Sequence, residues 1–183
     1  MKLLVITHDF TRSGAPILLL RVLKKIYQMK DIVVHLGCIN DIGELKKEYC
    51  EFCHKYIGSV SKPSFYRKYQ LYRAHYDVVL INTILAGKIV GQIKEITKAD
   101  VSVWIHEMSY TTKKYGEELL NNIKRYSNNI LVVDKETKGK IENDGYRNVK
   151  LLRGCIEVNK QTELTYSTND ALKLLFIATP QWR

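Results

Sequence analysis

Three apolar runs of this sequence are each followed by residues of the kinds that bind or transform small molecules. They are His8, Asp9, Ser13, Gly14 and Ala15 after residues 2–7, Asn82 and Thr83 after residues 77–81, and His106 and Glu107 after residues 101–105. An imidazole next to a carboxylate can donate a hydrogen bond to a hydroxylated ligand or accept its proton. These groups predict a polar binding site, provided that the fold brings the three run ends together.

The pattern of the chain predicts a fold that does so. Short runs rich in β-branched residues alternate with stretches whose apolar residues recur at helical spacing. The expected strands are residues 2–7, 32–37, 54–57, 77–81, 101–105, 130–133 and 149–152, and the expected helices are 15–28, 42–52, 64–75, 86–97, 115–126 and 136–143. Nearly continuous apolar strands separated by helices are typical of a parallel sheet covered on both faces. We therefore expect an α/β fold with a Rossmann-like, doubly wound, mainly parallel seven-stranded sheet of order 3-2-1-4-5-6-7.

The loop after the first expected strand is suited to an anion. Gly14 lets the backbone approach a ligand closely, and Pro16 fits the first turn of a helix. A helix that starts here offers free N–H groups to a phosphate or carboxylate, although an ordinary strand–loop–helix connection would have the same pattern. Neither G-x-G-x-x-G nor G-x-x-x-x-G-K-[ST] occurs in the sequence, which excludes the dinucleotide and P-loop patterns.

The cysteines give no indication of a metal or a prosthetic group. Cys38, Cys50, Cys53 and Cys155 are expected to be free thiols in a cytosolic chain. The string C-x-x-C-H at residues 50–54 matches a haem-attachment pattern, but we interpret it as a coincidence because no export signal precedes it. No second Cys/His pair completes a zinc site, and D-x-D is absent. We expect neither a cofactor nor a metal.

The formal net charge of +10 indicates either an anionic partner or lysines that keep the protein in solution. Within residues 64–75, Phe65, Tyr69 and Tyr72, with Tyr76 just beyond, share one helical face. The simpler interpretation is a face buried against the sheet. The alternative is a face that meets an anionic membrane or a lipid-linked acceptor, and its candidate cations are Lys62, Arg67, Lys68, Arg73, Lys113 and Lys114.

The domain organisation follows from a change in composition. We expect one domain over residues 1–156, a polar linker over 157–170, and the first strand of a second, truncated domain over 171–183. No apolar run approaches the ~20 residues that span a bilayer. The expected location is the cytoplasm, with a peripheral contact at the inner face of the cell membrane if the aromatic helix serves that purpose.

The motifs together resemble the retaining glycosyltransferases of family 4, which have the GT-B fold. The matching segments are Ser13-Gly14-Ala15-Pro16 after the first strand, Asn82-Thr83 after the fourth, Trp104-Ile105-His106-Glu107, residues 149–156, and residues 174–183 as the opening of a second domain. The usual Asn-Gly of the family's linker segment is Arg153-Gly154-Cys155 here.

The resemblance implies that the chain is one half of a metal-independent GT-B hexosyltransferase of polysaccharide biosynthesis, incomplete without its donor domain. In such enzymes a sugar moves from a nucleotide-sugar donor to a sugar or lipid-linked acceptor with retention of configuration. The resemblance places Ser13, Gly14 and Ala15 near the donor phosphates and His106, with Glu107, at the transferred sugar. It leaves His8, Asp9, Asn82 and Thr83 for the acceptor.

Two other classes of function stay open at this point. The same edge of the sheet could serve a non-catalytic α/β binding module or a partner subunit. A nucleic-acid-binding domain has the net charge alone in its favour, because nucleic acid calls for basic residues and stacking aromatics along one groove, and we do not expect it.

Overall fold

The structure is a computed structural model that describes residues 1–107 and 117–153. Its strands form one parallel sheet of order β3-β2-β1-β4-β5-β6-β7, as the sequence predicts. The strands are β1 (Lys2–Thr7), β2 (Val33–Cys38), β3 (Lys55–Ser59), β4 (Val78–Asn82), β5 (Asp100–Ile105), β6 (Asn129–Val132) and β7 (Val149–Leu151). Because all strands run in one direction, their C-terminal ends lie along one side of the sheet, which we call the carboxyl edge.

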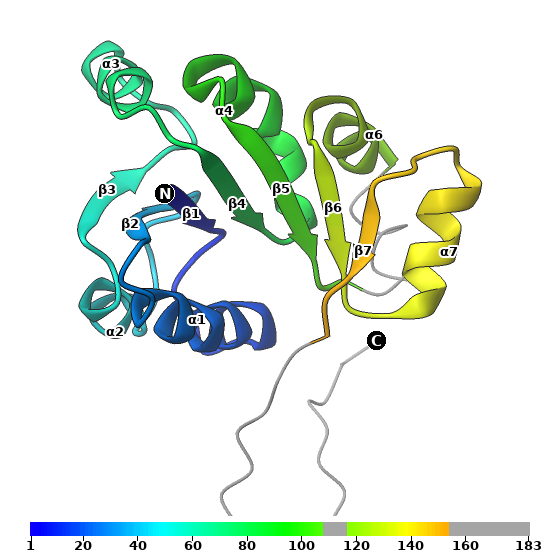
Figure 1. The fold of residues 1–183 in the computed structure, drawn as a ribbon, viewed down its shortest axis with the longest axis horizontal. Coiled ribbons are helices and arrows are strands. Elements are labelled where there is room, and N and C mark those ends of the chain that lie inside the picture. The colour runs from blue at the N-terminus through cyan, green and yellow to red at the C-terminus, as the bar shows by residue number, and fades with distance from the viewer. Residues whose placement is uncertain (108–116, 154–183) are drawn as a thin grey trace, which may run out of the picture.

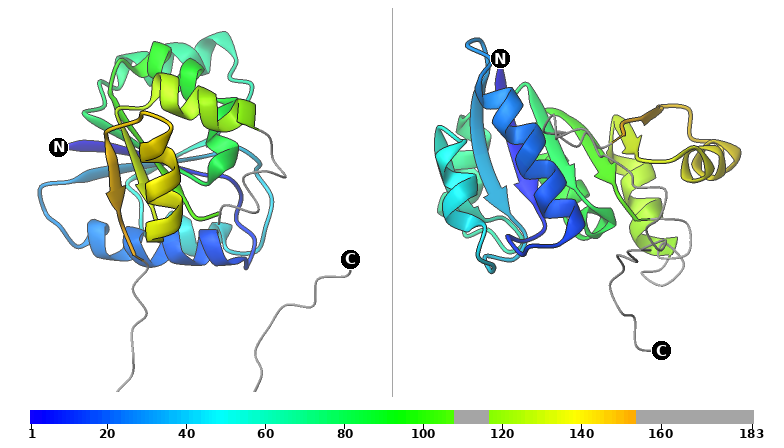
Figure 2. Two further views of the ribbon diagram at one scale, coloured as in Figure 1. Left: turned by 90° about the vertical axis from the view of Figure 1, so that its right-hand side faces the viewer. Right: turned by 90° about the horizontal axis from the view of Figure 1, so that it is seen from below.

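Helices cover both faces of the sheet (Figures 1 and 2). The helical elements are α1 (Gly14–Tyr27), α2 (Lys46–Glu51), α3 (Phe65–Arg73), the 3₁₀ helix η1 (Ile84–Lys88), α4 (Val90–Thr97), α6 (Glu117–Tyr126) and α7 (Lys135–Asn143). Helices α1 and α2 lie on one face, and α3, α4 and α6 lie on the other, while α7 flanks β7 (Figure 1). In the described chain, the ends of β1, β2, β3, β4 and β6 each lead into a helical element at the carboxyl edge.

The strand side chains alternate between two apolar cores. In β1, Leu3 and Val5 pack with α1 and α2, whereas Leu4 and Ile6 pack with the opposite layer. A strand buried on both sides is apolar at nearly every position, which is why residues 3–6 form an unbroken apolar run within β1. The cores thus fix β1, β4 and β5, the strands whose ends hold the candidate site.

The predicted helix over residues 42–52 is wrong in its first third. Helix α2 begins at Lys46, because residues 42–45 pack against the loop after β1 instead. The Phe10 N–H donates to the Ile42 carbonyl, and Leu45 N–H donates to the Phe10 carbonyl. Gly43 has a φ of 115°, and a Cβ there would lie 2.2 Å from the Phe10 backbone. A close backbone approach of this kind requires glycine.

The predicted helix over residues 86–97 is in fact two elements, of which the first begins at Ile84. Thr83 caps η1 by accepting a hydrogen bond from the Leu85 N–H, and α4 follows from Val90. Gly87 of η1 packs directly on α6, where a Cβ would lie 2.3 Å from the Leu119 carbonyl oxygen. Asn122 of α6 donates to the Gly87 carbonyl at 3.3 Å. The tight crossing of η1 and α6 explains why the chain interrupts a regular helix here.

The aromatic face of the third helix is exposed, contrary to the simpler interpretation of its sequence. Phe65, Tyr69 and Tyr72 lie in solvent, whereas Tyr76, beyond the end of α3, is buried. The buried residue of α3 itself is Leu71. Arg67 is also not the surface cation that we expected, because its guanidinium turns inward and donates to the Ser59 carbonyl at 2.6 Å.

Several sequence predictions lie outside the described residues. The predicted linker 157–170, the predicted strand of a second domain at 171–183, Cys155, Lys113 and Lys114 belong to this group. Within 1–107 and 117–153, none of the helices has the length and apolar character needed to cross a membrane.

The crossing of η1 and α6 predicts the effect of adding one methyl group. We expect Gly87→Ala to lower the free energy of unfolding by about 2–3 kcal/mol, because the new Cβ meets a backbone carbonyl that cannot move aside. Gly139→Ala in α7 is the matched control, since a Cβ there has no neighbour within 4 Å. It should raise stability by about 0.5–1 kcal/mol through helix propensity. Urea unfolding midpoints measure the stability of both variants. Equal midpoints would contradict the close packing of Gly87 on α6.

Candidate functional site

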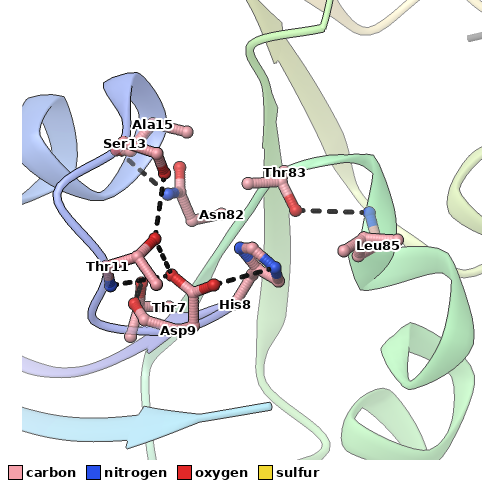
Figure 3. A network of polar contacts seen from close by, with 9 residues as sticks. All are labelled: Thr7, His8, Asp9, Thr11, Ser13, Ala15, Asn82, Thr83 and Leu85. Atoms are coloured by element: carbon pink, nitrogen blue, oxygen red, sulfur yellow. Dashed lines mark hydrogen bonds and ion pairs between the residues drawn. The ribbon is translucent and has the colours of Figure 1, made fainter. Parts of the chain in front are cut away.

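The fully buried side-chain amide of Asn82 joins three segments at the carboxyl edge. Its Nδ2 donates to the Ala15 carbonyl in the first turn of α1 at 3.2 Å, and its Oδ1 lies 2.6 Å from Nε2 of His106 (Figure 3 shows the contact with Ala15). The ends of β4 and β5 are neighbours in the sheet, with Asn82 opposite Trp104. The structure therefore brings together the loop before α1, the end of β4 and His106, all of which the sequence named as candidates.

His106 is held as a neutral imidazole. Burial lowers its pKa to about 4, and its ring packs at 4.3 Å from the ring of Trp104. Since Asn82 Nδ2 is the donor to Ala15, Oδ1 is the acceptor, and Nε2 of His106 must carry the proton of their hydrogen bond. The neutral ring then keeps the lone pair on Nδ1, which can accept a hydrogen bond from a ligand hydroxyl.

Glu107 uses its carboxylate to position backbone. Its Oε2 accepts from the N–H of Ile84 at 3.0 Å and from the N–H of His106 at 3.1 Å. Burial raises its pKa, and the backbone N–H groups of Glu107, Ile84 and His106, together with the nearby His8, oppose that rise. The carboxylate thereby ties the loop after β5 to the start of η1. Its geometry is that of a positioning residue next to His106.

Thr83 has a strained backbone at the centre of this arrangement. Its φ of 76° and ψ of 163° fall in a region that is almost restricted to glycine. Its N–H donates to the Trp104 carbonyl at 2.8 Å, and its Oγ1 accepts from the Leu85 N–H at 3.3 Å. With a 3% exposed side chain, Thr83 shapes the loop after β4 and presents little surface to an acceptor.

Asp9 organises the loop between β1 and α1 (Figure 3). Its Oδ1 accepts from the N–H and the hydroxyl of Thr11, and its Oδ2 lies 3.2 Å from Nε2 of His8. The Thr11 hydroxyl continues to the Ser13 hydroxyl at 3.2 Å. Asp9 is 6% exposed, so its carboxylate faces the loop and not solvent. Among the described residues, buried Nδ1 of His8 and Nε1 of Trp104 have no hydrogen-bond partner.

The start of α1 is open to an anion. Ser13 occupies the N-cap position without a side-chain capping hydrogen bond, and the first turn of α1 contains no acidic residue. A Cβ at Gly14 would have no neighbour within 4 Å. The free N–H groups and the positive end of the helix dipole favour phosphate or carboxylate at this position.

A cavity of the described chain lies away from the residues named above, and the described residues contain no cluster of possible metal ligands. A cavity of about 730 Å³ lies between α6 and α7 and is lined by residues such as Glu117, Lys124 and Lys140. His106, Asn82 and Gly14 do not line this cavity. Within the residues that the structure describes, no three His, Cys, Asp or Glu side chains group as a metal site would require.

Two contributors to the site were missed from the sequence. Thr11 completes the Asp9 turn, and the spacing Asp9-x-Thr11 is a turn signal that could have revealed it. Trp104 supports the His106 ring, but a tryptophan in an apolar strand has no pattern that distinguishes support of a site from ordinary packing. The Cys50-x-x-Cys53-His54 string contains free thiols, and His54 Nδ1 accepts from the Val34 N–H.

Comparisons with known proteins agree with this architecture. The sequence model of the family described as "Glycosyl-transferase family 4" matches residues 1–172. A search of curated proteins found no match. The fold is similar to Anabaena HepE in complex with UDP and glucose, with a TM-score of 0.67, 16% identity, and coverage of 86% of this chain and 45% of that one.

A second similar fold is that of the lipopolysaccharide outer core galactosyltransferase WaaB in its apo form. Its TM-score is 0.63 at 14% identity, with 87% of this chain and 47% of that chain covered. The chain therefore spans about half the length of the solved structures that it matches. At these identities the likeness shows a common fold, with a Rossmann-like half that corresponds to part of a GT-B structure.

The low pKa of His106 predicts a loss of stability in mild acid. Between the usual histidine pKa of 6.5 and the folded value of about 4, the unfolded chain binds a proton that the folded chain does not. Stability therefore falls as the pH drops through this window, by up to about 3 kcal/mol for a shift of this size. His106→Gln keeps a donor for Asn82 but does not titrate, so its unfolding free energy should fall less steeply from pH 7 to pH 4.

The control for this measurement is His75→Asn. His75 is an exposed histidine with a φ of 48°, a conformation that asparagine tolerates. This variant should keep the wild-type pH dependence. Burial also lowers the pKa of His35, but His35 is present in the wild type and in both variants, so its contribution is the same in all three. Identical slopes for His106→Gln and the wild type in urea titrations would show that His106 is not buried as a neutral ring.

Proposed function

Because the chain belongs to glycosyltransferase family 4, we propose that it forms the acceptor-side half of a retaining enzyme that transfers a hexose from a nucleotide sugar to an acceptor hydroxyl. The observation that carries this proposal is the hydrogen-bonded connection from Ala15 through Asn82 to His106. It links an anion-binding helix start to a neutral imidazole that can accept from a hydroxyl. A nucleotide sugar carries both groups, a diphosphate and a hydroxylated ring.

The start of α1 takes the donor phosphates in this proposal. Gly14 has no side chain between the backbone and the ligand, and the N–H groups of the first turn of α1 carry partial positive charge. Phosphate binding at a helix start also stabilises the negative charge that grows on a departing diphosphate. No metal ion is needed for this role, in keeping with the absence of D-x-D from the sequence.

His106 orients the sugar that is transferred. Its neutral Nδ1 accepts a hydrogen bond from a sugar hydroxyl, while Asn82 holds Nε2 and fixes the ring. Glu107 positions the His106 backbone and the start of η1, so that we assign it to positioning and not to proton transfer. The acceptor side of the edge is shaped by Asp9, Asn82 and Thr83. We assign His8, whose Nε2 lies 3.2 Å from Oδ2 of Asp9, to the same side.

The donor nucleotide itself binds to a second domain in this proposal, as the resemblance implies. The similarity to HepE with bound UDP and with bound UDP-glucose makes UDP-hexoses the first donors to test. A sugar or lipid-linked acceptor and a cytoplasmic location complete the proposal, with polysaccharide biosynthesis as the process.

The central test measures glycosyl transfer by the complete gene product that carries these residues. With UDP-hexoses and sugar acceptors, we expect UDP release and a product whose anomeric configuration matches the donor by NMR. His106→Ala should lower kcat/KM about 10- to 100-fold, the effect of losing a hydrogen bond to a buried polar group. His75→Asn, at an exposed histidine outside the site, should keep full activity. An inverted product would contradict retention, and nucleotide-sugar binding without transfer would favour a binding module.

A second test separates the donor loop from folding. Gly14→Val should leave the free energy of unfolding within about 0.5 kcal/mol of the wild type, because a Cβ at this position has no neighbour within 4 Å. It should nevertheless lower kcat/KM for the nucleotide sugar, since the side chain occupies the space of the phosphates. Gly139→Val in α7, where a Cβ also has open space, should not change the kinetics. Equal activity of the two variants would show that the donor phosphates do not bind at the start of α1.

A further inference from the structure

Helix α3 presents an aromatic face to solvent. Its exposed fractions are 87% for Phe65, 68% for Tyr66, 52% for Tyr69 and 54% for Tyr72. Large apolar side chains that gather on a surface mark an interaction site more often than single exposed ones do. This nine-residue helix thus carries an aromatic cluster that the packing of the described chain does not use.

The direction of this face is fixed by contacts on the inner side of α3. Leu71 is buried against the apolar layer that also contains Tyr76. Arg67 reaches back to the Ser59 carbonyl, and Gly58 leaves room for it, since a Cβ there would lie 2.8 Å from the guanidinium. With these residues on the inner side, the i, i+4 and i+7 positions Phe65, Tyr69 and Tyr72 point outward.

Cations accompany the aromatic rings, and acids do not. Lys62, Lys68 and Arg73 are exposed with the rings, and the Arg73 guanidinium lies 5.9 Å from the centre of the Tyr69 ring. Between Glu51 and Asp77 the sequence contains no aspartate or glutamate. The segment that carries the aromatic face is therefore basic and free of acidic residues, and this local charge favours an anionic partner.

We propose that the exposed face of α3 docks on an anionic lipid bilayer. Tyrosine and basic residues are the side chains that favour the interface between lipid headgroups and water, where a ring can bury its apolar body and keep its hydroxyl wet. The face belongs to a helix at an outer corner of the molecule (Figure 1). A planar partner can reach all four rings at such a place.

A nucleic acid fits this face less well than a bilayer. Bases stack on aromatic rings that line a groove. The cavity beside α3 measures about 20 Å³ and lies on its inner side, where Arg67, Leu71 and Tyr76 line it. That volume is too small for a base, and none of the four exposed rings of α3 lines it. The outward rings and the charge therefore fit a lipid surface.

Docking by α3 also gives the candidate site a direction. In a parallel α/β sheet each helix starts at the carboxyl edge, so Phe65 and Tyr66 lie at the same edge as His106 and the start of α1. The bilayer would therefore meet the protein on the side where a ligand of that edge enters. Binding to lipid does not require glycosyl transfer, and it is tested without it.

The experiment is co-sedimentation of the 183-residue chain with vesicles in low salt. We expect binding to vesicles of phosphatidylcholine with 40% phosphatidylglycerol, and at least tenfold weaker binding to phosphatidylcholine alone. Lys68→Gln with Arg73→Gln should weaken binding about 30-fold, as the loss of two surface cations does. Phe65→Ser with Tyr69→Ser should weaken it at unchanged charge. Because these four residues are exposed, circular dichroism should show that both variants fold.

The matched control is Lys30→Gln with Lys47→Gln, which removes the same charge from exposed positions outside α3. It should keep at least half of the wild-type affinity. A loss equal to that of the α3 variants would overturn the proposal in favour of unspecific charge attraction. Two other results would do the same: equal sedimentation with neutral and anionic vesicles, and binding of a single-stranded oligonucleotide, by fluorescence anisotropy, that the α3 variants abolish while vesicles fail to bind.

Discussion

The carboxyl edge of this protein depends on the buried amide of Asn82. One end of the amide is bonded to the first turn of α1 and the other to the ring of His106, so that a single side chain sets the distance between them. The next residue, Thr83, has a backbone conformation that costs of order 1–3 kcal/mol and persists only when its surroundings hold it. Bonds to Trp104, Leu85 and, one residue on, Glu107 do so. The polar groups of the edge are therefore arranged before any ligand arrives.

The parts of the fold that were predicted correctly are those with a local signal. Strands β1, β4 and β5 are buried on both faces, so their apolar runs mark their limits to within one residue. The start of α2 was predicted wrongly because Gly43 meets Phe10, a residue that is distant in sequence. The candidate residues at the strand ends were named from residue type and position. Their individual contacts were not, since the partners of Asn82 and Glu107 include backbone groups that leave no trace in the sequence.

Helix α3 shows why periodicity alone cannot tell an inner from an outer face. Its aromatic residues recur at helical spacing, and so does the pair Arg67 and Leu71. The second pair lies on the inner side, because the guanidinium of Arg67 donates to the carbonyl of Ser59 and its aliphatic stem can pack as an apolar group. The carbonyl of Ser59 at the end of β3, outside the helix, therefore helps to determine which face of α3 is turned inward.

The position of β1 in the sheet has a consequence for how the chain reaches its fold. β1 precedes every other described strand in the sequence, yet it lies inside the sheet, between β2 and β4. Each later strand then pairs with one that has already been made: β2 and β4 with β1, β3 with β2, and β5, β6 and β7 each with the strand before it. During synthesis on the ribosome the sheet can therefore form outward from β1, because each new strand finds its pairing partner already synthesised.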